Sequence, residues 1–208
     1  MKTVTLSEAR SDLIRERVLG GVEALLAGGQ ALTFTALAAA AAVPERTIYR
    51  HFPTREALLG AVFDWVNQRL GVDTQRPTDA AGLAALVRQV FPGFERMAPL
   101  VRELLASPEG RLARLSANPE RQRAALALVQ REVPGLDRLS ARRLSAVVQL
   151  LGAAATWQSL CDYWGMDGAE AAEASVLASE LILEGARARA AKRKRPREAA
   201  RSRVEGRS

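Results

Sequence analysis

Polar and charged side chains suited to DNA binding crowd a short stretch near the N-terminus, Glu45-Arg46-Thr47-Ile48-Tyr49-Arg50-His51. If this stretch is a helix that buries Ile48, then carboxylate, guanidinium, hydroxyl and phenol groups remain outside. A short helix of this kind is slim enough for the major groove of DNA, where such groups bond to base edges and phosphates. The stretch therefore indicates nucleic-acid recognition.

The elements around this stretch predict a helix-turn-helix. Thr33 can cap a short helix over 34–41, a turn follows, and Pro44 is suited to the first position of the next helix. Thr54 can cap a fourth helix, and a first helix is expected over 7–27. The apolar side of the two short helices must pack on these longer ones, and it consists of Leu37, Ala38, Val43, Ile48 and Phe52.

Catalytic and metal chemistry finds little support in the composition. The chain has one cysteine, Cys161, and one histidine, His51, so it can build neither an internal disulfide framework nor a Cys/His zinc site. No acidic or nucleophilic partner is placed near His51 by the sequence. We therefore expect no catalytic residue, no metal and no cofactor.

Charge and hydropathy indicate a cytoplasmic protein with a basic tail. There is no apolar signal segment at residues 1–5, and the longest apolar stretch, 36–43, is too short to cross a bilayer, so no membrane partner is expected. Residues 191–208 hold eight Lys or Arg and two Glu, a net +6 of the total +7. We predict a disordered tail there, which is either simply solvated or attracts DNA phosphates without sequence preference.

The organisation expected for the chain is all-α with two domains. A three-helix helix-turn-helix DNA-binding domain, with a linking fourth helix, covers residues 1–70, and a helical effector-binding and dimerisation domain covers 71–190. Prolines mark most of the expected breaks in the second domain. Its helices are predicted near 78–91, 93–106, 109–116, 119–132, 140–164 and 168–190.

The run from Tyr49 to Leu59, YRHFPTREALL, resembles the N-terminal signature of the TetR family of transcription regulators. In that signature a Tyr-x-x-Phe precedes a short Ser/Thr-Lys-Glu-x-Leu stretch, and the resemblance covers roughly residues 14–66. Three departures are Ala42 in place of a turn glycine, Pro44 in place of a Ser/Thr cap, and Arg55 in place of lysine. Ala42 implies a strained or reshaped turn, whereas Arg55 keeps the charge.

The resemblance also implies a set of DNA contacts. Phosphate contacts are expected from Thr33, Thr35, Tyr49, His51 and Arg55. Base edges would be nearest to Glu45, Arg46, Thr47 and Arg50, with Pro44 at the start of the same helix.

The helix expected over 140–164 is apolar around most of its girth. One stripe is Val147, Leu150, Ala154, Trp157, Cys161 and Trp164, and a second is Leu144, Val148, Leu151 and Ala155. One stripe can serve the core of the subunit and the other a partner. The resemblance implies a four-helix dimer interface from the last two helices; a single larger bundle is the alternative. The candidate interface residues are Val147, Leu150, Ala154, Cys161, Val176 and Leu183.

Large apolar side chains between the predicted domains suggest a pocket for an apolar or aromatic effector. The candidates are Trp65, Phe94, Met97, Val101, Leu104, Leu105, Leu126, Val129 and Trp157. The alternative for each of them is an ordinary place in the core.

Together these features predict a homodimeric, sequence-specific transcription regulator, a repressor that a small-molecule effector releases from a palindromic operator. Two alternatives stay open at this point. One is a constitutive architectural DNA-binding protein without ligand response, and the other is a helical enzyme, which the shortage of catalytic residue types disfavours.

Overall fold

The computed structural model describes residues 6–72 and 76–205, with side chains as far as Lys192. These residues form eleven α-helices, and no strand occurs among them, which confirms the all-α fold class. The helices are α1 (Leu6–Ala27), α2 (Phe34–Ala41), α3 (Glu45–His51), α4 (Arg55–Leu70), α5 (Ala80–Arg96), α6 (Ala98–Ala106), α7 (Pro108–Ser116), α8 (Asn118–Glu132), α9 (Arg138–Leu151), α10 (Ala154–Trp164) and α11 (Gly168–Glu205).

Two compact units make up the chain. Unit 1 comprises Met1–Asp73 and Phe94–Ala117, and unit 2 comprises Thr74–Gly93 and Asn118–Ser208, so the division falls inside α5. The predicted domain boundary near residue 70 differs from this division, because α6 and α7 pack on α1 and α4 of unit 1. The physical reason is the apolar face of α6, where Leu100, Val101 and Leu104 are buried.

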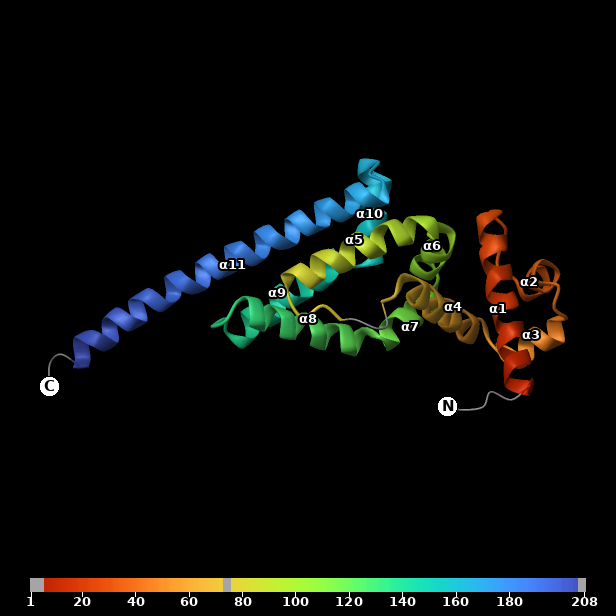
Figure 1. The fold of residues 1–208 in the computed structure, drawn as a ribbon, viewed down its shortest axis with the longest axis horizontal. Helices are drawn as coiled ribbons and strands as arrows, with labels where there is room; N and C mark the ends of the chain where they lie inside the picture. Colours follow the sequence, from red (N-terminus) through yellow and green to blue (C-terminus); the bar gives the residue numbers. More distant parts are fainter. Residues whose placement is uncertain (1–5, 73–75, 206–208) are drawn as a thin grey trace. The chain divides into compact units, whose positions relative to one another are not determined.

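In unit 1, α2 packs on α1, and α3 packs on α2 (Figure 1). The predicted apolar side of the two short helices is confirmed: Leu37, Val43, Ile48 and Phe52 are buried, while Ala38 is half-buried. Val18 and Val22 of α1 and Leu59 and Val62 of α4 are buried in the same unit. A seven-residue helix such as α3 is marginal alone, so this burial is what holds it in place.

Gly21 lets α1 and α2 approach closely. A Cβ added at Gly21 would lie 2.9 Å from Ala41 Cβ and 3.1 Å from the Ala41 backbone nitrogen. The neighbouring Gly20 is different, because a Cβ there would meet nothing within 4 Å. Close contact between α1 and α2 therefore explains Gly21. Gly20 makes no such contact and only weakens the helix.

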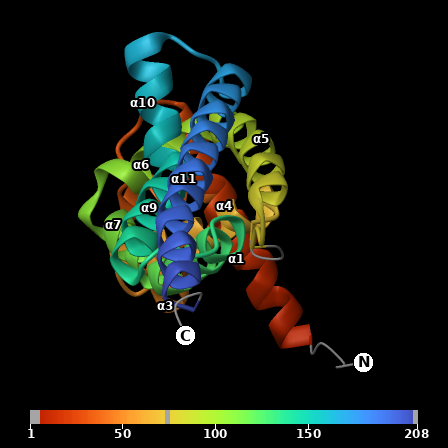
Figure 2. The same ribbon diagram turned by 90° about the vertical axis from the view of Figure 1, so that its left-hand side faces the viewer.

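Unit 2 gathers α8, α9, α10 and α11, with α9, α10 and α11 in mutual contact (Figure 2). Its core includes Leu128, Val129 and Val148, and the inner face of α11 adds Val176 and Leu183. Two ion pairs join α11 to other helices of the unit. Arg88 of α5 holds Glu173 through two hydrogen bonds of 2.7 and 2.9 Å, and Arg187 binds Glu132 of α8.

Three predicted helix boundaries need correction. The helix expected over 140–164 ends at Leu151, and α10 begins at Ala154, because Gly152 and Ala153 leave the helical path and the Thr156 hydroxyl donates to the Leu150 carbonyl at 2.6 Å. Helix α5 continues through Pro92, where burial of Phe91 and Gly93 offsets the missing backbone donor.

The third correction concerns the tail. Helix α11 continues to Glu205, where the sequence analysis expected disorder from residue 191. Alanine, arginine, lysine and glutamate are good helix formers, so a lack of large apolar side chains does not prevent a helix here. No single helix among the described residues has the length and apolar character to cross a membrane; only α9 and α10 taken together, bent by 59°, meet that test.

Exchanging each glycine of the pair for alanine should have opposite effects on stability. Gly21→Ala should lower the free energy of unfolding by about 1–3 kcal/mol, because the new methyl group would push against the backbone of α2. Gly20→Ala should raise it by up to about 1 kcal/mol through helix propensity alone. Urea unfolding followed by circular dichroism measures both. Equal effects of the two substitutions would contradict the close contact between α1 and α2.

Candidate nucleic-acid interface

Helix α3 presents a compact polar surface. Arg46, Tyr49 and Arg50 are exposed, and the Tyr49 side chain keeps 45% of its surface open, a large value for an aromatic residue. Ile48, on the opposite side, is fully buried. The other predicted members of this surface, Glu45, Thr47 and His51, are half-buried, and Pro44 is exposed. The structure therefore brings these residues together on one short helix.

Helix α2 supports this surface from the side. The Phe34 ring stacks on the Tyr49 ring with centroids 4.4 Å apart and an angle of 12° between the planes. The Thr35 hydroxyl donates to a Glu45 carboxylate oxygen at 3.2 Å. Sequence analysis missed the role of Phe34. Its only signal was an aromatic side chain at the start of a short helix, which is equally typical of a core residue.

The turn between α2 and α3 contains strain at Ala42. This residue has φ 49° and ψ 44°, a left-handed conformation that disfavours residues with a Cβ by roughly 1–2 kcal/mol. The expectation of a strained turn is thus confirmed. Pro44 is the N-cap of α3 rather than its first helical residue, and its carbonyl accepts from the Thr47 and Ile48 amides at 2.8 and 3.1 Å.

The two predicted threonine caps are confirmed. The Thr33 hydroxyl oxygen accepts from the Ala36 amide, and the Thr54 hydroxyl oxygen accepts from the Ala57 amide, each at 3.1 Å. Both threonines are exposed, so further free amides in the first turns of α2 and α4 remain near the surface. Helix N-termini of this kind attract phosphate groups.

His51 lies at the end of α3 beside other cationic groups. Burial lowers the pKa of its imidazole below the usual 6.5, and the charges of Arg50 and Arg15 lower it further. The Nε2 atom is buried and has no hydrogen-bond partner among the described residues. Arg15 covers the neighbouring Phe52 ring at 4.9 Å. His51 is therefore mainly neutral at pH 7, and any contact with phosphate must use its other nitrogen.

Arg55 is engaged within the protein. Its guanidinium donates to the Leu32 carbonyl and to a Glu103 carboxylate oxygen, both at 2.5 Å, and lies 3.8 Å from Glu109. Glu103 and Glu109 had no place in the sequence analysis. They lie about fifty residues away in the chain, and no local pattern connects them to Arg55.

The predicted pocket residues are divided between the two units. Unit 1 contains Trp65, Phe94, Met97, Val101, Leu104 and Leu105, and unit 2 contains Leu126, Val129 and Trp157. Within unit 1, the Trp65 indole donates to Glu16 at 3.2 Å and is covered by Arg69 at 3.7 Å. Trp65 therefore already has partners on α1 and α4.

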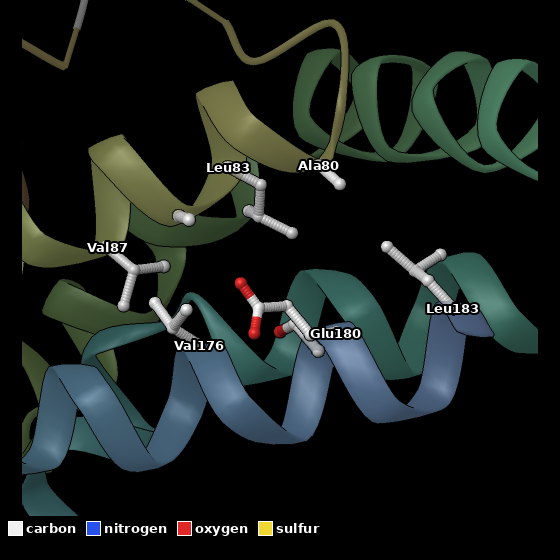
Figure 3. Close-up of a pocket in the computed structure, with 8 residues that line it drawn as sticks. Ala80, Leu83, Val87, Val176, Glu180 and Leu183 are labelled. Atoms are coloured by element: carbon white, nitrogen blue, oxygen red, sulfur yellow. The ribbon is translucent and has the colours of Figure 1, made fainter. Parts of the chain in front are cut away.

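Unit 2 has a small cavity of about 10 Å³ between α5 and α11 (Figure 3). Leu83 and Val87 face Val176 and Leu183 across it, with Glu180 at its edge. This volume accommodates about one water molecule. None of the predicted pocket residues lines this cavity.

The predicted dimer residues also separate into two groups. Val147 and Leu150 are exposed, and Ala154 and Cys161 are half-buried. Val176 and Leu183 are buried inside unit 2, which corrects their assignment to a partner-facing surface. The break at Gly152 shifts the register of the apolar stripe, so Trp157 enters the core. Among the described residues of unit 2, the large apolar side chains that are exposed are Leu139, Val147, Leu150, Tyr163, Trp164, Leu177 and Leu181.

Comparison with known proteins adds one finding on this region. Residues 23–62 match the family model described as bacterial regulatory proteins, tetR family. No curated protein matches the chain. The matched stretch runs from α1 through α2 and α3 into α4, and it includes every predicted DNA contact.

His51 should make the folded state less stable at acidic pH. Its folded-state pKa lies below 6.5, so the unfolded chain binds more protons between the two values. The stabilisation is complete above pH 6.5 and is lost as the pH falls through the folded-state pKa. Because the chain has a single histidine, one imidazole NMR signal reports this titration. His51→Gln should flatten the dependence, and a titration above 6.5 in the free protein would contradict the structure.

Proposed function

We propose that this chain, whose residues 23–62 match the TetR-family model, is a DNA-binding transcription regulator of that family and a cytoplasmic repressor of a palindromic operator. The observation that carries this proposal is the exposed surface of α3, with Arg46, Tyr49 and Arg50 held outward by the burial of Ile48. Guanidinium groups on such a helix pair well with guanine edges and phosphates. Because the matched family consists of regulatory proteins, the proposed role is regulatory rather than enzymatic.

The proposed contacts divide by chemistry. Arg46, Thr47 and Arg50, together with Glu45, would meet base edges in the major groove. Tyr49 would reach a phosphate from its stack on Phe34, and His51 would do so from the end of α3. Thr33, Thr35 and Pro44 border the same surface and would contact the backbone of the operator.

A homodimer is part of the proposal, because one short helix reads few base pairs. Two copies related by a two-fold axis would read half-sites about one DNA turn apart, roughly 34–36 Å. The support in this chain is the exposed apolar surface of unit 2, where Leu150 on α9 and Leu181 on α11 keep 57% and 59% of their surfaces open. Large apolar side chains left exposed in a single chain are the kind that a subunit interface buries.

Release by a small apolar or aromatic effector completes the proposal. Its support is the uniformly apolar character of the predicted pocket residues, several of which, including Val101 and Val129, are buried. The cavity in unit 2 is much smaller than an effector and is lined by none of these residues, so it does not locate the effector site. The effector must prefer one arrangement of the dimer in order to shift the DNA-binding equilibrium.

Substitutions on the surface of α3 should weaken operator binding without unfolding the protein. Arg46→Ala and Tyr49→Ala should each reduce affinity by about 1–3 kcal/mol, because each removes a proposed base or phosphate contact. Fluorescence anisotropy on a sequence selected from a random DNA pool measures the loss. Thermal unfolding should stay close to the unmodified protein.

The matched control is Arg123→Ala, which removes an exposed arginine from α8 of unit 2 and should leave affinity unchanged. Wild-type affinity in both α3 variants would overturn the assignment of the site. Footprinting distinguishes an operator-specific regulator from an architectural DNA-binding protein. One protected palindrome supports the regulator, whereas uniform coverage of the DNA supports the architectural protein.

Charged substitutions on the apolar surface of unit 2 should dissociate the dimer. Leu150→Glu and Leu181→Glu place a carboxylate where the partner would bury apolar surface, and each should shift sedimentation velocity toward the monomer. The control is Leu112→Glu on α7, an exposed leucine in unit 1, which should sediment as the unmodified protein does. Dimers that persist in both unit 2 variants would exclude this surface as the interface.

A further inference from the structure

Arg55 lies at a junction of four segments of unit 1. It belongs to the first turn of α4, and its guanidinium joins the Leu32 carbonyl before α2 to Glu103 of α6. Glu109 of α7 adds a second carboxylate at 3.8 Å. The Arg55 side chain is 34% exposed and that of Glu103 is 22% exposed, so water screens this pair less than a fully exposed one.

The charges around Arg55 disfavour a DNA phosphate at this position. Two carboxylates face one guanidinium, and Glu56 follows it directly in the chain. A phosphate approaching Arg55 would meet these negative charges and compete with two hydrogen bonds that are already formed. The surroundings instead suit a side chain whose forked donors join two fixed acceptors.

The backbone of Glu103 is itself held by a tight corner between α6 and α7. The Ser107 hydroxyl donates to the Glu103 carbonyl at 2.7 Å and accepts from the Gly110 amide at 3.2 Å. A Cβ at Gly110 would collide with the backbone of Leu104, so the corner closes around this glycine. Glu103 therefore extends from a well-fixed backbone.

At its other end the junction fixes the start of the DNA-reading helices. Leu32 is buried, and Thr33, the next residue, caps α2 through both its hydroxyl and its carbonyl, which accepts from Leu37 at 2.9 Å. Helix α2 in turn supports α3 through the Phe34–Tyr49 stack. A shift of the Leu32 carbonyl would therefore move the platform under the recognition surface.

We propose that Glu103 is a positioning residue for DNA binding, which holds Arg55 so that Arg55 fixes the Leu32 carbonyl and the start of α2. This inference rests on the DNA-binding function proposed above. It assigns Arg55 a role within the protein in place of the phosphate contact that the family resemblance implies.

Neutralising Glu103 tests the proposal, because simple electrostatics and positioning predict opposite signs. Removing a negative charge from a DNA-binding surface should normally strengthen binding. We expect Glu103→Gln to weaken operator affinity about two- to thirtyfold, the range found for residues that transmit coupling, while the slope of log affinity against log salt stays unchanged. Unchanged or stronger binding by Glu103→Gln would overturn the proposal.

Arg55→Lys is the second variant. Lysine keeps the charge for a phosphate but cannot join Leu32 and Glu103 as a fork does, so affinity should fall while the salt slope stays the same. Arg55→Gln should also keep the slope, and combining it with Glu103→Gln should cost little beyond either single change. A slope reduced by about one phosphate contact in Arg55→Gln would identify a phosphate ligand and contradict the positioning role.

The matched control is Glu23→Gln. Glu23 also pairs with an α4 arginine, Arg69 at 3.5 Å, but this pair lies at the other end of α4 and is more exposed. This variant should bind the operator as the unmodified protein does. A loss equal to that of Glu103→Gln would show that any α4 ion pair suffices and would overturn the specific role of Glu103.

Hydrogen exchange measured without DNA tests the positioning role of Glu103 independently of the proposed DNA-binding function. The Ala36 and Leu37 amides, both bonded to Thr33, should exchange faster in Glu103→Gln and Arg55→Lys than in Glu23→Gln. If the unmodified protein binds no operator, DNA recognition fails, but this comparison still decides whether Glu103 positions α2. Equal exchange in all three variants would exclude the positioning role.

Discussion

A seven-residue helix that must present a fixed polar surface is the constraint on which the rest of unit 1 depends. Helix α3 has too few backbone hydrogen bonds to be stable by itself, so its position comes entirely from its neighbours. Ile48 anchors it in the core, Phe34 supports Tyr49, and Gly21 allows α2 to lie close enough to α1 for this support to form. The left-handed Ala42 shows that the fold tolerates backbone strain to keep the turn short.

Unit 2 is constrained differently, because some of its large apolar side chains remain outside its own core. The break at Gly152 turns one apolar stripe into two parts, so Trp157 enters the core while Leu150 stays exposed. On α11 the same division separates Val176, which is buried, from Leu177 beside it. The hydrophobic residues of unit 2 thus form an inner and an outer surface. Within a single chain, only the inner surface is buried.

Local patterns were enough to predict much of unit 1, and contacts distant in sequence explain the failures. The caps at Thr33 and Thr54 depend on residues three positions away, so the sequence predicted both, and the buried face of α2 and α3 followed from helical spacing. The partners of Arg55 depend on the fold bringing α6 beside α4, which no local pattern contains. The inward turn of Val176 and the break at Gly152 likewise depend on neighbouring helices, since 3.6-residue periodicity cannot tell an inner apolar face from an outer one.

The distribution of charge makes accurate positioning more important than bulk attraction. Residues 191–208 contribute +6 of the total +7, so the rest of the chain is nearly neutral and has little general attraction for the phosphate backbone. In the proposed function, two exposed arginines on α3, Arg46 and Arg50, would then supply much of the recognition. When few contacts carry the binding energy, a small displacement of their platform affects a large share of it. Under the proposed role of Glu103, this is why the contact of Arg55 with the Leu32 carbonyl would affect DNA binding by α3.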